Sequence, residues 1–175
     1  MLVSGIKCFI IPLKWEKVGK HVLREKNVSM VMLIGEYTHL IDEKKRVSLP
    51  AKFRKELGRK VVVTHGLDNC LFLYSLKSWM KVSEKLGQLS IGKAQTRGFN
   101  RFMLAGAVEA EVDSIGRILI PDFLKEFANL DSRVVFAGVH DRIEIWNEDK
   151  WKDYKKQIEK DADALAEKLG EVGVL

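Results

Sequence analysis

Two stretches of the chain show the same order of hydrophobic and polar positions. Residues 60–65 and 133–139 are rich in β-branched side chains, which favour strands. Shortly after each stretch, a leucine or isoleucine recurs at every second position, and this alternation indicates a strand with one buried face. The alternating positions are Leu71, Leu73, Ile143 and Ile145. The pattern therefore predicts two similar pairs of strands.

The similarity extends beyond the strands and amounts to an internal repeat. A shift of 71 residues, or of 72 after one inserted residue, superposes glycine, aspartate, arginine, proline and tryptophan in the same order. Chance does not supply so many special residues in one order, so we infer a duplication. The matched pairs are Gly35 with Gly106, Asp42 with Asp113, Arg46 with Arg117, Pro50 with Pro121, Gly66 with Gly138 and Trp79 with Trp151.

Each copy predicts the same series of elements. A strand leads into a short polar connection and a second strand, which a proline then ends. Proline cannot donate to a sheet but suits the first turn of a helix, so Pro50 and Pro121 predict short helices over 51–57 and 122–129. The strands expected before these prolines are 36–41 and 46–49 in the first copy and 107–112 and 117–120 in the second.

Apolar residues at helical spacing occur between the copies and after them. Residues 76–89 predict one helix and 94–104 a second, and the apolar positions from Trp151 to Leu169 step by three and four. This last stripe fits packing on its own domain or, alternatively, contact with a neighbouring subunit. The expected organisation is an N-terminal extension (1–31), a first domain (32–80), a helical linker (81–104), a second domain (105–149) and a C-terminal helix (150–175).

The size of the repeated unit points to an interlocked or oligomeric protein. A copy of about 45 residues is marginal for a core of its own and needs a partner surface. The other copy can supply that surface, and the edges of the short strands can also pair with other chains. We therefore expect a homo-oligomer.

Composition and charge restrict the classes of protein. Of the 175 residues, 46% are hydrophobic and 31% charged, which is typical of a globular protein and not of a disordered or membrane-spanning one. Fourteen basic and six acidic side chains give +8 over residues 32–101, whereas ten basic and sixteen acidic ones give −6 over 102–175. The basic half suits a nucleic acid. Cys8 and Cys70 are too few for a disulfide framework and indicate a reducing cytoplasm.

No converging set of catalytic residues is apparent, so we do not expect an enzyme. The four histidines have no companions at metal-ligand spacing, and no phosphate-binding glycine loop is present. Cys70 opens an apolar strand and is interpreted as a core residue. Glu109 and Glu111 share a strand face, which a solvated surface explains better than a carboxylate pair. No cofactor, metal or small-molecule substrate is expected.

The repeated Asp-x-x-x-Arg string is the candidate site. One interpretation is structural, in which the aspartate orders a turn and the arginine pairs with it. The other is functional, because an arginine beside a lysine-rich hairpin tip suits phosphate contacts and the reading of guanine. We combine the two: Asp42 and Asp113 order the turn, and a set of basic side chains contacts DNA. That set is Lys44, Lys45, Arg46, Lys52, Arg54 and Arg117.

At these residues the chain resembles the MraZ family of bacterial transcription regulators, which are built from two tandem SpoVT/AbrB-like domains. The similarity extends from Met32 to about Tyr154. Two motif copies in the same order make the resemblance specific. The matching strings include Asp42-Glu43-Lys44-Lys45-Arg46-Val47-Ser48-Leu49-Pro50 and Asp113-Ser114-Ile115-Gly116-Arg117-Ile118-Leu119-Ile120-Pro121.

The resemblance implies a mixed, β-rich fold of two tandem swapped-hairpin β-barrel-like domains, with short helices, a linking helix and a C-terminal amphipathic helix. It implies subunits assembled into a ring that binds direct repeats in double-stranded promoter DNA. The controlled genes are the cell-division and cell-wall cluster that the regulator itself heads, usually under repression. A cytoplasmic, nucleoid-associated protein without a membrane partner is then expected.

One departure from the family pattern concerns the residue before the arginine. The family usually has glycine there, and the second copy keeps Gly116, which we assign to the turn, whereas the first copy has Lys45. If this position has a positive φ, lysine costs about 1 kcal/mol. The additional positive charge would partly offset that cost on DNA.

Residues 1–31 have no counterpart in the family pattern. We interpret them as the result of a start-site assignment upstream of Met30 or Met32, and the alternative is a basic arm that contacts phosphates.

Two rival functions follow from the sequence. One is a ring-forming scaffold whose basic face is incidental. The other is RNA binding, which is disfavoured because the motif region lacks aromatic residues for base stacking.

Overall fold

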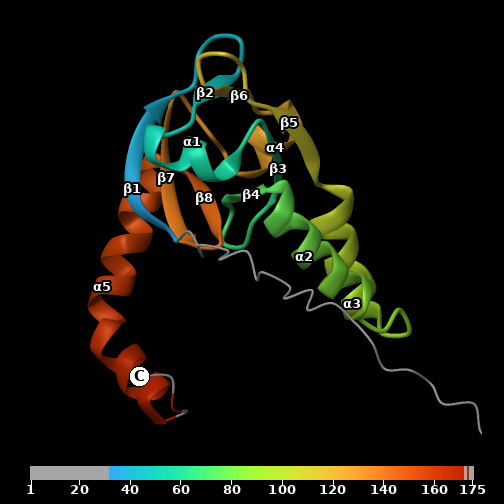
Figure 1. The fold of residues 1–175 in the computed structure, drawn as a ribbon. Helices are drawn as coiled ribbons and strands as arrows, with labels where there is room; N and C mark the ends of the chain where they lie inside the picture. The colour runs from blue at the N-terminus through green and yellow to red at the C-terminus, as the bar shows by residue number, and fades with distance from the viewer. Residues whose placement is uncertain (1–31, 172, 174–175) are drawn as a thin grey trace, which may run out of the picture. The chain divides into compact units, whose positions relative to one another are not determined.

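The two copies have the same order of elements in the computed structural model, which describes residues 32–171 and 173 (Figure 1). The first comprises β1 (Leu33–Leu40), β2 (Arg46–Ser48), α1 (Ala51–Leu57), β3 (Lys60–His65), β4 (Leu71–Ser75) and α2 (Leu76–Gly87). After α3 (Ala94–Asn100) and a π-helical turn (Arg101–Ala105), the second comprises β5 (Val108–Glu111), β6 (Arg117–Leu119), α4 (Asp122–Phe127), β7 (Arg133–His140), β8 (Arg142–Asn147) and α5 (Glu148–Glu171). The predicted strands and helices are confirmed, and the interpretation of residues 1–31 lies outside the described residues.

The strands of the two copies are interleaved in one six-stranded antiparallel sheet. Its order is β1-β7-β8-β4-β3-β5. The first strand of each copy therefore lies beside the third strand of the other copy, because β1 pairs with β7 and β5 pairs with β3. The short strands β2 and β6 also pair across the copies. This exchange confirms the expected swapped hairpins.

The barrels that the resemblance implied are not closed in the described part of the chain. Strands β1 and β5 are the two edges of the six-stranded sheet, and β2 and β6 form a separate two-stranded ribbon. Each first strand has one sheet neighbour only among the described strands, so the sheet stays open at both ends. The fold is a β-rich, interlocked pair of repeats with an open sheet.

One face of the sheet and the ribbon enclose a core that both copies build. Equivalent residues of the two copies meet there, such as Leu49 and Ile120, which are fully buried, and Phe53 and Leu124, which are buried to within 1%. Burying a side chain of this size stabilises the fold by about 1.5–3 kcal/mol. Because the same core holds residues of both copies, neither copy encloses a core by itself. The predicted boundaries of the two domains therefore divide the sequence but do not separate two independent cores.

The opposite face of the sheet carries an aromatic cluster that holds the beginning of α5. Trp146 lies at the end of β8, and its ring centroid is 5.3 Å from that of Trp151 and 5.0 Å from that of Tyr154. Tyr74 and Trp79 complete the cluster from the first copy. From Lys156 to Glu171 every residue of α5 is exposed. The first turns of the helix therefore pack on their own sheet, but its distal part does not.

No helix within 32–171 combines the length and the apolar character required to span a membrane.

Candidate nucleic-acid interface

The two Asp-x-x-x-Arg hairpins meet at the ribbon formed by β2 and β6 (Figure 1). Val47 faces Ile118 at the centre of the ribbon, and both side chains are buried in the core. Because side chains alternate along a strand, the flanking residues project to the other face of the ribbon. These flanking residues are Arg46, Ser48, Arg117 and Leu119. The buried valine and isoleucine thus fix both arginines on one outer face.

Each aspartate orders its own hairpin turn. The Oδ1 atom of Asp42 accepts hydrogen bonds from the backbone N–H groups of Lys44 and Arg46, both at 2.9 Å. The Oδ1 atom of Asp113 accepts from the N–H groups of Ile115 at 3.1 Å and Arg117 at 2.8 Å. This is the geometry of an aspartate that closes a turn on its own backbone. This geometry is compatible with the turn-ordering role that the sequence suggests for both aspartates.

The second carboxylate oxygen of each aspartate holds the arginine of the same hairpin. Arg46 donates from Nε to Oδ2 of Asp42 at 2.9 Å, and its Nη2 lies 2.8 Å from the same atom. Arg117 donates from Nε to Oδ2 of Asp113 at 2.9 Å. Its Nη1 also reaches Oδ2 of Asp42, at 3.4 Å. The four side chains therefore form one cluster that joins the two copies.

Hydrogen bonds lower the pKa of both aspartates. For Asp42 the bond from the Arg46 side chain is the main cause, and the bond from the Arg46 N–H group adds to it. For Asp113 the N–H group of Arg117 is the main cause. Both carboxylates are therefore ionised over the neutral range, and each counters the charge of its arginine. The cluster holds two arginines in fixed positions without a net charge of its own.

The residue before each arginine, Lys45 or Gly116, has a positive φ. The φ angle is 60° at Lys45 and 85° at Gly116, and in each turn this residue donates to the carbonyl oxygen of the aspartate at 2.9 Å. The Lys45 Nζ atom lies 2.6 Å from the carboxylate of Asp122 in the other copy. The charge that replaces the glycine is thus countered within the protein. Lys44, by contrast, is exposed at the hairpin tip.

Arg54 lies beneath the second hairpin. Its Nε atom donates to the carbonyl oxygen of Leu49 at 2.7 Å, and its guanidinium group lies against Gly116. A Cβ atom at Gly116 would overlap Cζ of Arg54. Lys52 is exposed on α1. Of the six basic residues assigned to DNA, Lys45 and Arg54 are engaged between the copies, Arg46 and Arg117 are held by aspartates, and Lys44 and Lys52 are exposed.

Two kinds of residue at this face were not predicted from the sequence. Asp122 pairs with Lys45 across 77 positions of sequence, and no local sequence pattern predicts such a contact. Ile115 and Leu119 are apolar residues of the second hairpin with exposed fractions of 57% and 54%. The exposure of Leu119 follows from its place next to the buried Ile118 in β6, whereas Ile115 lies in the turn. The outer face of the ribbon is therefore partly apolar as well as basic.

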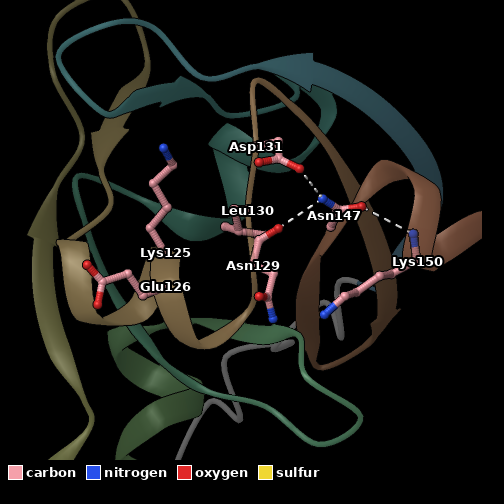
Figure 2. A pocket seen from close by; sticks show the side chains of 7 residues that line it. All are labelled: Lys125, Glu126, Asn129, Leu130, Asp131, Asn147 and Lys150. Atoms are coloured by element: carbon pink, nitrogen blue, oxygen red, sulfur yellow. Dashed lines mark hydrogen bonds between the residues drawn. The ribbon is translucent and has the colours of Figure 1, made fainter.

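A separate hollow of about 500 Å³ lies where α5 begins (Figure 2). At its edge the Asn147 amide donates to the carbonyl oxygen of Asn129 at 2.9 Å and to Oδ2 of Asp131 at 3.0 Å. The Asn147 Oδ1 atom accepts from the backbone N–H groups of Asp149 and Lys150. These bonds cap the helix and satisfy the amide, and none of the candidate site residues lines the hollow. We interpret it as a structural junction.

The remaining candidates for chemistry are separate from one another. Within residues 32–171 no three histidine, cysteine, aspartate or glutamate side chains gather as a metal site. Cys70 is buried, and this burial raises the pKa of its thiol far above the usual range. Glu109 and Glu111 are exposed on β5, as a solvated strand face requires.

The fold and this cluster define a class of protein, namely an internally duplicated chain whose halves exchange hairpins and present a pair of aspartate-held arginines. Comparison with known proteins gives the family. The model of the family described as "MraZ protein, putative antitoxin-like" matches the chain twice, over residues 32–102 and 103–171. The chain belongs to the MraZ family.

Several curated relatives are similar over nearly their whole length. A protein named "Transcriptional regulator MraZ" from Caldanaerobacter subterraneus subsp. tengcongensis is 53% identical over 138 residues, which are 79% of this chain and 96% of the relative. The protein of the same name from Caldicellulosiruptor saccharolyticus is 51% identical over 143 residues, which are 82% of this chain and all of the relative.

Proposed function

We propose that the chain is a transcriptional regulator that binds double-stranded DNA through the outer face of the β2–β6 ribbon. The observation that carries the proposal is the convergence of Arg46 and Arg117, from different copies, on Asp42. The names of the relatives support the same class of function. Two arginines side by side on a projecting ribbon suit the edges of neighbouring bases in the major groove.

The aspartates prepare the arginines for this role. Each Nε–H group is already engaged by an aspartate, which fixes the plane of the guanidinium group. Among the described residues, Nη1 of Arg46 and Nη2 of Arg117 have no hydrogen-bond partner and remain available as donors. An arginine fixed before binding loses less side-chain entropy when it contacts a guanine. Each such contact discriminates against other bases by about 1–3 kcal/mol.

The exposed lysines supply the contacts that depend on charge and not on sequence. Lys44 at the hairpin tip and Lys52 on α1 are free to reach phosphates. Lys45 and Arg54 add positive charge close to the ribbon, while Lys45 pairs with Asp122 of the other copy and the Arg54 guanidinium lies against Gly116. The excess of basic residues over 32–101 makes the first copy the principal contributor, and the acidic second copy contributes mainly Arg117.

We further propose that the target is a set of direct repeats in the promoter of the cell-division and cell-wall cluster, and that binding represses it. A homo-oligomeric ring in the cytoplasm, associated with the nucleoid, would place several ribbons on successive repeats. Linked binding events of this kind raise the overall affinity without any new contact. The swapped fold with two open sheet edges is compatible with such an assembly.

A gel-shift assay with the DNA upstream of the chain's own gene tests the proposal. We expect binding that requires the repeats and weakens steeply as the salt concentration rises, because counterions are released from the DNA. Arg46→Ala should abolish detectable binding, and Arg117→Ala should weaken it less. Arg101→Ala removes the same charge from an exposed position in the π-helical turn and should retain wild-type affinity.

The double variant Arg46→Ala/Arg117→Ala decides the assignment. Circular dichroism must first show that it is folded. If it then binds the promoter as tightly as the wild type, the ribbon is not the DNA-binding face.

A further inference from the structure

The distal part of α5 presents an apolar stripe that no other part of the described chain covers. Ile158, Ala162, Leu165 and Leu169 are spaced by four, three and four residues, which is the spacing of a coiled-coil seam. The exposed fractions are 39% for Ile158, 41% for Leu165 and 43% for Leu169. In proteins, most of the stability of an amphipathic helix comes from packing of its apolar side. The stripe therefore indicates a docking surface.

A second apolar patch lies on the hairpin formed by α2 and α3. Trp79 and Leu86 of α2 face the aromatic cluster of their own sheet. Met80 is 69% exposed, and three apolar residues farther along the hairpin are also exposed. Those three are Leu89, Ile91 and Phe99. Four large apolar side chains are thus exposed along one helical hairpin.

Charge decides which surface the stripe fits. Residues 158–171 carry five acidic and two basic side chains, a net charge of −3. Residues 76–100 carry five basic and one acidic side chain, a net charge of +4. Two α5 stripes brought together would repel each other, with −3 on each side. The acidic stripe and the basic hairpin attract, and complementary charges of this kind fix the choice of partner.

We propose that the α5 stripe of one copy docks on the α2–α3 hairpin of a second copy of this chain. The proposal rests on the proposed self-association and names the surfaces that carry it. Lys77 and Lys81, one turn apart beside Met80, would flank the apolar contact and face the carboxylates of α5. The contact is heterologous, so every subunit retains one free stripe and one free hairpin until the assembly closes on itself.

Cysteine cross-linking between different chains tests the contact. Met80→Cys and Leu165→Cys are made in separate full-length chains that both carry Cys8→Ser, which leaves the buried Cys70 as the only other thiol. Under mild oxidation we expect a cross-linked pair of two 20.0 kDa chains from the mixture and not from either chain alone. Glu167→Cys lies on the opposite side of α5 from Leu165 and should not cross-link to Met80→Cys.

Two results would overturn the proposal. Efficient cross-linking of Leu165→Cys with itself would show that α5 pairs with α5. Equal cross-linking of Met80→Cys to Leu165→Cys and to Glu167→Cys would show random encounters and no defined interface.

The mass of the assembly and its DNA binding separate this proposal from the proposed function. In light scattering, Leu165→Lys should reduce the mass towards 20.0 kDa. Glu167→Gln changes the net charge by the same amount on the other side of the helix and should not reduce it. Leu165→Lys should still bind a single repeat in a manner that depends on Arg46, but lose the gain from additional repeats. An unchanged mass for Leu165→Lys would refute the docking, whatever the DNA result.

Discussion

A single backbone conformation in the two hairpins is occupied by residues of different kinds. Lys45 and Gly116 both have a positive φ, but the space beside them differs. The Lys45 side chain extends towards Asp122, whereas the position of a side chain at Gly116 is taken by Arg54. Lysine is therefore tolerated in the first turn at the cost of backbone strain, and the second turn requires glycine for two reasons.

Gly116→Ala should destabilise the fold. The positive φ costs about 1 kcal/mol for a residue with a Cβ atom, and displacing Arg54 from the Leu49 carbonyl oxygen adds about 0.5–1.5 kcal/mol. Urea unfolding measures the total. Gly98→Ala on α3 is the matched control: nothing lies within 4 Å of its Cβ, and alanine should stabilise that helix by about 0.5–1 kcal/mol. A Gly116→Ala protein as stable as the wild type would contradict the packing described for Arg54.

Much of the site could be predicted at the level of single residues. The spacing of Asp42 and Arg46 was sufficient to predict a turn-closing carboxylate with an arginine beside it, and both contacts are present. The link from Arg117 to Asp42 and the pairing of Lys45 with Asp122 could not be predicted. They join residues 75 and 77 positions apart, and local spacing carries no information on them.

At the scale of elements, the ribbon formed by β2 and β6 contributes both to the stability of the fold and to the proposed function. Its inner face contributes Val47 and Ile118 to the core, and its outer face carries the aspartate-arginine cluster. The repeated series of elements and the prolines that follow predicted both strands. It did not predict that β2 pairs with β6, because pairing between elements depends on which surfaces meet in the folded chain.

The cluster should make the stability of the protein depend on pH in the acid range. The pKa of Asp42 and of Asp113 in the folded protein lies below the usual 3.8, so the unfolded chain binds protons first as the pH falls. The contribution of the cluster is therefore present above about pH 4 and is lost as the pH falls through the lower pKa values of the folded state. Unfolding by urea at pH 7, 4 and 3 measures the decrease.

The variant Asp42→Asn/Asp113→Asn isolates this contribution. Asparagine keeps an acceptor for the backbone N–H groups but has no charge to lose, so the variant should be less stable at pH 7 and lose less on acidification. Glu109→Gln/Glu111→Gln, which removes two carboxylates from the exposed face of β5, should decrease in stability as the wild type does. If both variants show the wild-type decrease, the cluster is not responsible for it.

At the scale of the whole molecule, the two copies are folded through each other. Each pair of β1 and β7, and of β3 and β5, joins one copy to the other. The repeat in the sequence revealed that the molecule is doubled, and the resemblance to a known family indicated swapped hairpins. The open sheet was not foreseen, because neither the period nor the motifs of a repeat determine whether its outer strands meet.

The two halves should therefore fold together and not apart. We expect fragments 32–102 and 103–171, produced separately, to form no stable folded monomer, since each lacks the partner of its first strand. Mixed in equal amounts, they should form a one-to-one complex with the sheet signal of the intact chain. Circular dichroism and native mass spectrometry follow this recovery. A fragment 32–102 that unfolds cooperatively as a monomer would show that the exchange of strands is dispensable.

The two copies interleaved in the sheet differ in sequence, and this difference gives the ribbon a direction. If the two copies were identical, a rotation of 180° that exchanges β2 and β6 would leave the surface of the ribbon unchanged. Such a surface would match a palindromic DNA site. Here the half turn exchanges Lys45 with Gly116 and Asp122 with Ala51, so the surface after the turn differs from the surface before it. A bound duplex can therefore be told from its reverse. On the proposed function, a duplicated chain whose copies have diverged would bind DNA in one direction, and head-to-tail sites would suit it.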